Sequence, residues 1–171
     1  MTYKWIGAIL IVTGCGGFGF SLANAYRREI QLLRQLRLSL QFMQSELKFR
    51  LTPLPQLCAM TGKETDGTLR SLFFMLSQEL EQQIAPEVSG CMNAVVRKHR
   101  EELPASVRKL LYRLGKSLGR FDLPGQLRGL EAICAACEEE LAALNQNKDI
   151  RFRNYQTLGM CAGIALVILF V

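Results

Sequence analysis

The chain of 171 residues has little of what enzymes and β-sheet proteins usually need. It contains one histidine, His99, and one histidine cannot build a histidine-rich metal site. Residues 31–149 hold 23 leucines but only six valines or isoleucines, whereas parallel sheets are rich in β-branched residues. The sequence has no phosphate-binding P-loop, nucleophile elbow or zinc-ligand motif. We therefore expect an all-α protein that is not an enzyme, with no catalytic residue, cofactor or metal.

Long runs without charge lie near both ends of the chain. Residues 5–26 are 22 consecutive uncharged residues, and residues 154–171 are 18 more. Helices of these lengths measure about 27–33 Å, close to the hydrocarbon thickness of a bilayer. We predict an N-terminal transmembrane segment at 1–26, a cytoplasmic helical-bundle domain at 27–153 and a C-terminal transmembrane segment at 154–171.

The net charge of +6 is concentrated beside these apolar ends. Residues 38–147 carry 13 basic and 13 acidic side chains and are therefore neutral. The excess is +3 over residues 27–37, +2 over residues 148–153 and +1 at Lys4. This positive-inside pattern predicts a protein of the cell membrane whose central domain is cytoplasmic. Attraction to lipid headgroups without spanning is the alternative.

Glycines interrupt the first apolar segment in "VTGCGGFGFS" (residues 12–21), where three of them fit the G-x-G-x-x-G fingerprint of dinucleotide-binding proteins. A helical sequence, and no second strand, follows them, which opposes that interpretation. We interpret the glycines as small residues that let membrane helices approach closely, as in the G-x-x-x-G motif of the C-terminal segment. The predicted helix-packing residues are Gly14, Gly16, Gly17, Gly19, Gly159 and Gly163.

Two other interpretations of the N-terminus remain open. "ANA" (23–25) resembles a signal-peptidase site, and "VTGC" (12–15) resembles the lipobox before a lipid-modified cysteine, here Cys15. Either would export the central domain, which the arginines of residues 27–37 oppose. Cys15 and Cys161 lie in the apolar segments, and the other four cysteines form no disulfide framework, so we expect thiols.

The central domain shows helical periodicity throughout. We predict a first helix at 27–51 and a second helix that begins after Thr52 as its N-cap and ends before a loop at 62–67. Further helices are predicted at 68–84, 87–100 and 104–119, and a last helix runs from about 123 towards the second apolar segment. Together they form an antiparallel bundle of about six helices. Gly119 is expected after a helix end and Asp122 as an N-cap. The expected inward residues of the helix at 27–51 are Ile30, Leu33, Leu40, Met43 and Leu47, and those of the helix at 104–119 are Val107, Leu110, Leu111, Leu114 and Leu118. Those of the last helix are Leu127, Leu130, Cys134, Cys137, Leu141 and Leu144.

Three groups of residues are candidates for chemistry or binding. Cys134 and Cys137 form a C-x-x-C motif, which we interpret as core packing, with a membrane-tethered thiol-redox protein as the alternative function. His99 is expected at the surface. Acidic residues are absent between Glu102 and Asp122, and we predict either a solvated face or a docking face for an acidic cytoplasmic partner there. Its residues are Arg108, Lys109, Arg113, Lys116 and Arg120. We expect no nucleic acid, because no aromatic residues interleave for base stacking.

The chain resembles the stage III sporulation protein AB family over nearly its whole length. The resemblance lies in "WIGAILIV", "RREIQLLRQLRLSLQFMQSELKFRLTPLPQL", "LGKSLGRFDLPGQ" and "RFRNYQTLGMCAGIALVILFV". Its most specific parts are the helix leading to Thr52-Pro53-Leu54, the turn around Gly119 and Asp122, and the Tyr155…Leu158-Gly159 stretch. The sequence departs from the pattern at Phe49-Arg50-Leu51, where the family often has a Tyr-Gly pair.

The resemblance implies a component of the channel between mother cell and forespore in endospore-forming bacteria, in the outer forespore membrane on the mother-cell side. The soluble part of the family is similar to the helical domain of type II secretion F-type platform proteins, which lie beside a secretion-type ATPase. The implied function is a non-catalytic membrane platform. The implied partners are other membrane subunits of the channel, that ATPase and the lipid bilayer, and oligomerisation is compatible with this function.

Overall fold

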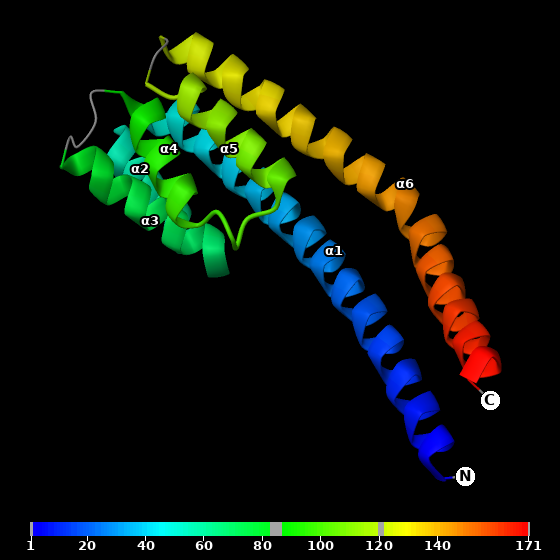
Figure 1. The fold of residues 1–171 in the computed structure, drawn as a ribbon. Coiled ribbons are helices and arrows are strands. Elements are labelled where there is room, and N and C mark those ends of the chain that lie inside the picture. The colour runs from blue at the N-terminus through cyan, green and yellow to red at the C-terminus, as the bar shows by residue number, and fades with distance from the viewer. Residues whose placement is uncertain (1, 83–86, 120–121, 171) are drawn as a thin grey trace. The chain divides into compact units, whose positions relative to one another are not determined.

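The computed structural model contains six helices and no strand in the part of the chain that it describes (Figure 1). It describes the backbone of residues 2–82, 87–119 and 122–170, and the side chains of residues 24–82, 87–119 and 122–146. The helices are α1 Thr2–Arg50, α2 Leu54–Glu64, α3 Gly67–Glu81, α4 Val88–Lys98, α5 Ala105–Ser117 and α6 Leu123–Phe170. The all-α fold and the helical bundle predicted from the sequence are confirmed.

The chain divides into two compact units. One unit is the terminal pair Met1–Arg28 and Ala142–Val171, and the other is Glu29–Leu141. In the terminal unit the Tyr26 hydroxyl donates a hydrogen bond to the carbonyl oxygen of Leu144. The predicted boundaries at residues 26 and 153 stay a prediction.

Residues 1–23 of the first predicted transmembrane segment, the whole of the second segment, and the glycines of both lie outside the residues whose side chains are described. The backbone from residue 14 to residue 19 belongs to α1, so the strand and turn of a dinucleotide-binding unit do not form there. Within the part of the chain that the structure describes fully, no helix is both long enough and apolar enough to cross a membrane.

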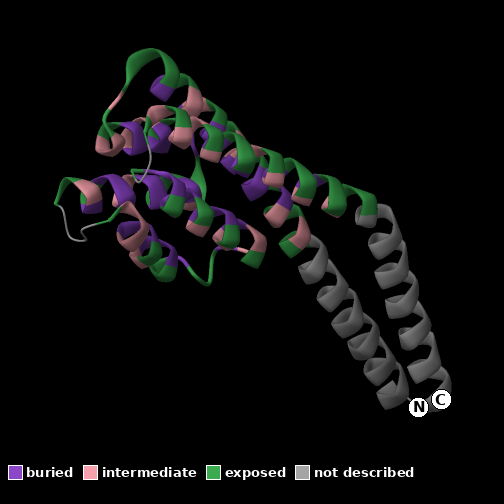
Figure 2. Cartoon of the chain, turned by 90° about the horizontal axis from the view of Figure 1, so that it is seen from above, coloured by how far each residue is buried: buried purple, intermediate pink, exposed green. Residues whose placement is uncertain are grey.

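The core of the unit Glu29–Leu141 is built from leucines at helical spacing (Figure 2). On α1 every residue of the predicted inward face is buried, from Ile30 to Leu47. Because residues three and four apart share one side of a helix, one side of α1 is covered and the opposite side is exposed. The largest fully buried side chains of the unit are Phe73, Leu33, Leu36, Leu40, Met43, Leu57, Leu69, Leu72, Leu76, Met92, Leu111 and Leu114.

Consecutive helices pack on one another: α2 on α3, α3 on α4, and α4 on α5. Only residues 65 and 66 separate α2 from α3, so the predicted loop at 62–67 is wrong in length. A link this short turns the chain back into a helical hairpin. Thr65 stabilises it by donating its hydroxyl to the carbonyl oxygen of Thr61 at 2.9 Å.

The predicted N-cap at Thr52 is also wrong. Helix α2 begins after Pro53, which adopts φ −57° and ψ 142° and provides no side-chain cap. The Thr52 hydroxyl instead donates to the Glu46 carboxylate at 3.3 Å. Pro55 lies in the first turn of α2. A proline is tolerated there because its missing N–H would have had no helical partner.

The end of α5 and the start of α6 agree with the prediction on either side of residues 120 and 121, which lie outside the described part. Gly119 follows the end of α5 with φ +75°, a conformation that glycine adopts without a Cβ penalty. Asp122 caps α6, because its Oδ1 accepts the Gly125 N–H at 3.2 Å. The predicted seam of α6 is correct only in part, since Ile133 is buried and Cys134 is half-exposed.

Candidate functional site

Helix α5 presents the one basic face that the sequence predicted, and its other face anchors it in the bundle. Val107, Leu110, Leu111, Leu114 and Leu118 are all buried, as expected from their spacing. Gly115 allows a close approach to α4: a Cβ there would lie 2.6 Å from the Cβ of Met92. The outward side chains of α5 therefore project from a firmly packed helix.

The exposed cations of this face are Lys109, Arg113 and Lys116. Their spacing of four and three residues places them on one side of α5. The ion pairs of the described side chains join Arg37 to Glu138, Arg50 to Glu46, and Lys98 to Glu79, so none of the three cations is used in one. Arg120 lies outside the described residues. The three side chains are thus charged groups available to a partner.

Arg108 differs from these cations because it holds the loop before α5. It is half-buried, and its Nη1 donates to the carbonyl oxygens of Arg100 at 2.9 Å and Leu103 at 2.7 Å. Both acceptors lie in the connection between α4 and α5. The predicted docking role of Arg108 is untested, and its hydrogen bonds give it a structural role as well.

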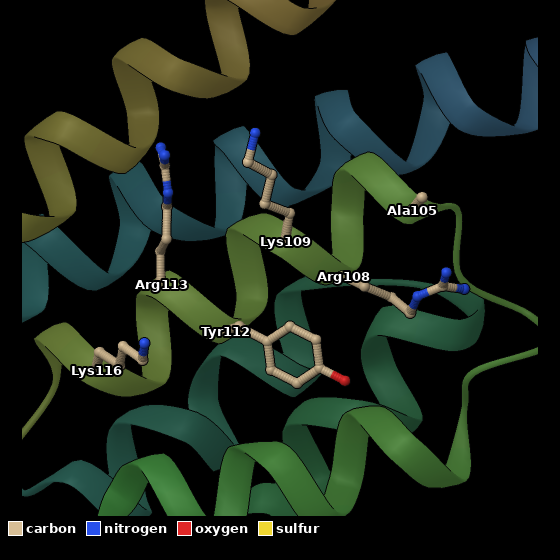
Figure 3. A pocket seen from close by; sticks show the side chains of 6 residues that line it. All are labelled: Ala105, Arg108, Lys109, Tyr112, Arg113 and Lys116. Atoms are coloured by element: carbon tan, nitrogen blue, oxygen red, sulfur yellow. The ribbon is translucent and has the colours of Figure 1, made fainter.

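A shallow, open depression of about 340 Å³ lies along α5 (Figure 3). It is lined by Ala105, Arg108, Lys109, Tyr112, Arg113 and Lys116. In the close-up Lys109 and Arg113 point to the same side of the helix, and the Tyr112 ring lies on the other side with Arg108. Four of the five predicted partner-binding residues are therefore brought together around one depression.

Tyr112 was missed by the sequence analysis. It lies four residues from both Arg108 and Lys116, and this spacing was the signal that could have found it. The expectation that no aromatic residue interleaves with the basic residues is wrong at this position. An aromatic ring among cations adds an apolar contact and a hydroxyl to a face that charge alone would leave unspecific.

His99 is buried, which corrects the prediction of a surface residue. It occupies the C-cap of α4, and its Nδ1 lies 3.1 Å from the Val95 carbonyl oxygen. The neighbouring charged residues suggested solvent exposure, but the chain turns at this position and carries the imidazole inward. Among the described residues no cluster of three His, Cys, Asp or Glu side chains could hold a metal ion.

The C-x-x-C motif is poorly suited to thiol chemistry. Cys137 is buried and Cys134 is half-buried, and both are free thiols. Loss of solvation raises the pKa of Cys137 to about 12, and the same effect, with Glu138 adding to it, raises the pKa of Cys134. Reactive cysteines need the opposite shift, because the thiolate is the nucleophile. The geometry favours core packing over the thiol-redox alternative.

Comparisons with known proteins agree with the resemblance found in the sequence. The sequence model of the stage III sporulation protein AB family matches residues 4–171 of this chain. The chain is 25% identical to stage III sporulation protein AB of Bacillus subtilis (strain 168) over 170 residues, which cover 98% of this chain and 99% of that protein. A solved structure of stage III sporulation protein AB has a TM-score of 0.65 at 22% identity and covers 72% of this chain and 98% of its own.

The last likeness supports the fold alone, and the first extends over almost every residue. The match along the chain shows the family, and the helical fold agrees with it. The protein belongs to the stage III sporulation protein AB family.

Proposed function

We propose that this protein is a non-catalytic membrane platform of the channel between mother cell and forespore, and that α5 docks a cytoplasmic secretion-type ATPase. The proposal rests on the exposed cations Lys109, Arg113 and Lys116, which surround the depression beside Tyr112. Complementary charge on the ATPase would orient the encounter, and the Tyr112 side chain would add contact area.

The membrane part of the proposal is supported by the sequence. The uncharged residues 5–26 and 154–171 are long enough to span a bilayer as helices. The basic excess next to them favours a cytoplasmic central domain on the mother-cell side. The glycines of these segments would let other membrane subunits of the channel pack closely against the two helices.

The proposal is tested by reversing the charge of the α5 face. We expect the triple substitution Lys109→Glu, Arg113→Glu and Lys116→Glu to abolish co-purification of the ATPase with the full chain from detergent extracts. Helicity, measured by circular dichroism, should be unchanged because all three side chains are exposed. Binding by the unmodified chain should weaken as salt is raised, since exposed charges are screened.

A matched control uses three exposed cations on other helices, Lys63→Glu, Arg70→Glu and Arg97→Glu. These changes alter the net charge by the same amount and should leave the ATPase bound. Equal loss in both variants would show that net charge, not the α5 face, controls binding. Undiminished co-purification of the ATPase with the α5 variant would remove the docking face from the proposal. Capture of RNA or DNA by the unmodified chain, instead of the ATPase, would identify a different partner.

A further inference from the structure

Helix α1 exposes a second apolar stripe on the side opposite the core. Leu38 is 64% exposed and Phe49 is 78% exposed, and half-buried Phe42 lies between them at the same angle around the helix. Buried residues such as Leu40 and Leu47 occupy the other side. A stripe with this spacing is typical of a helix that contacts two partners, one on each side.

The exposed stripe of α1 is flanked by cations and carries no acid. Arg34 and Lys48 are exposed and belong to none of the described ion pairs, and the Lys48 ammonium lies 5.6 Å from the centre of the Phe49 ring. The acids of this stretch are used elsewhere: Glu29 accepts the Ser106 hydroxyl at 2.5 Å, and Glu46 is buried. We call Arg34, Leu38, Phe42, Lys48 and Phe49 the outer face of α1.

Helix α6 exposes a surface of complementary character. The residues opposite its buried side are Glu131, Ala132, Ala135, Glu138 and Glu139, all exposed, and we call them the acidic face of α6. The exposed Arg128 borders this face one turn before Glu131 and donates its Nε hydrogen to the Pro124 carbonyl oxygen at 3.3 Å. No further lysine or arginine follows until Lys148. Alanine side chains leave room for larger side chains to insert between the glutamates. Glu138 pairs with Arg37 of the same chain, whereas Glu131 and Glu139 take part in none of the described ion pairs and are the glutamates available to a partner.

We propose that the outer face of α1 binds the acidic face of α6 in a second copy of this chain. Leucine and phenylalanine side chains would pack over the alanines, and the flanking cations would meet the glutamates. Pairing two α1 faces would instead bring cations against cations. The contact is therefore head-to-tail: in a pair, one copy keeps its α6 face free and the other keeps its α1 face free, so further copies can join in a ring or chain.

The contact is a single helix pair. From Arg34 to Phe49 the outer face of α1 is about 24 Å long, and a helix is about 10 Å wide. A face of this size covers about 240 Å², which is less than the area of about 800 Å² that each partner buries in a standard stable interface. We expect weak association of dilute copies. Copies confined to one surface would associate more, because confinement raises their effective concentration.

The test uses two variants of the full chain, each carrying one of two different affinity tags, expressed together and purified in detergent at high protein concentration. The α1 variant is Leu38→Gln with Phe49→Gln, and the α6 variant is Ala135→Arg with Glu139→Arg. We expect copies of the unmodified chain to purify together and each variant to lose association with itself. Mixing the two variants should restore one complete contact and recover the association.

Other outcomes would overturn the proposal. Self-association retained by the α6 variant, together with loss in the α1 variant, would indicate pairing of two α1 faces. Failure of the mixed variants to associate, or no effect of either variant, would place the contact elsewhere. Unmodified copies that never purify together would mean that no such contact exists.

The matched control is Ser71→Arg with Gln78→Arg, which changes two exposed residues of α3 and should leave association intact. Circular dichroism of each variant separates lost contact from lost folding. None of these substitutions touches α5, so self-association can fail while ATPase binding persists, and the reverse.

Discussion

The hydroxyl of Ser117 occupies the space where a side chain at Gly129 would begin. A Cβ built on Gly129 would lie 1.7 Å from Ser117 Oγ and 2.9 Å from its Cβ. This contact joins the last residue of α5 to the early part of α6. Ser117 Oγ is buried and has no hydrogen-bond partner among the described residues. The close approach of α5 and α6 therefore leaves one buried polar atom unpaired.

The substitution Gly129→Ala should destabilise the protein by about 1–3 kcal/mol, because overpacking outweighs the better helix propensity of alanine. Ser117→Gly combined with Gly129→Ala should recover part of the loss by making space. Ser117→Ala alone should be neutral or stabilising, since it removes an unsatisfied hydroxyl. Urea unfolding followed by circular dichroism measures all three. A fully stable Gly129→Ala variant would contradict the close contact.

The substitution Leu51→Gly should stabilise the protein by about 0.5–1 kcal/mol. Leu51 has φ +52°, a left-handed conformation that costs a side-chain-bearing residue about 1–2 kcal/mol. Glycine removes this strain but gains entropy in the unfolded chain, which offsets part of the benefit. The Leu51 side chain is 66% exposed, so little packing is lost.

Leu51→Ala is the control for this prediction, because it shortens the side chain and keeps the strain. Its melting temperature should stay close to that of the unmodified chain. If alanine stabilised the protein as much as glycine, the exposed side chain and not the backbone conformation would be responsible.

The substitution Arg108→Ala should destabilise the protein by about 1–2 kcal/mol, because a charged donor to two loop carbonyls is lost. Lys109→Ala, one residue away and exposed, should change stability by less than about 0.5 kcal/mol. Thermal unfolding of both variants, alongside ATPase co-purification, would separate the structural role of Arg108 from the proposed docking role of Lys109. Equal stabilities would show that the two hydrogen bonds contribute little.

Buried thiols should make the protein less stable at high pH. Burial raises the pKa of Cys58 and of Cys137 to about 12 from a usual value of 9.0. The folded state therefore holds these protons more tightly than the unfolded state, so the stabilisation is complete below about pH 9 and is lost as pH rises towards 12. Urea midpoints at about pH 8 and about pH 10.5 measure the loss.

The variant Cys58→Ala with Cys137→Ala should show a smaller fall in the urea midpoint between these two pH values, although its stability at neutral pH is lower.

At neutral pH iodoacetamide should modify the half-buried Cys134 before the buried Cys137. Rapid modification of Cys137 in the folded protein would revive the thiol-redox alternative.

The sequence alone determined most of the helices and their buried faces. Leucines three and four residues apart predicted the inward sides of α1 and α5, because a helix places such residues on one side whatever it packs against. Gly119 and Asp122 were predicted correctly for the same reason: a left-handed residue after a helix and an N-cap are local requirements of the backbone.

Only the tertiary structure decided how polar and small residues are used. Burial of His99, exchange of Cys134 for Ile133 in the core, and the hydrogen bonds of Arg108 depend on which helix lies opposite each residue. The stripe of Leu38 and Phe49 has the same spacing as a core face, and only the three-dimensional arrangement shows that no described part of the unit covers it. Periodicity sets the direction of a side chain, but burial depends on its neighbours in space.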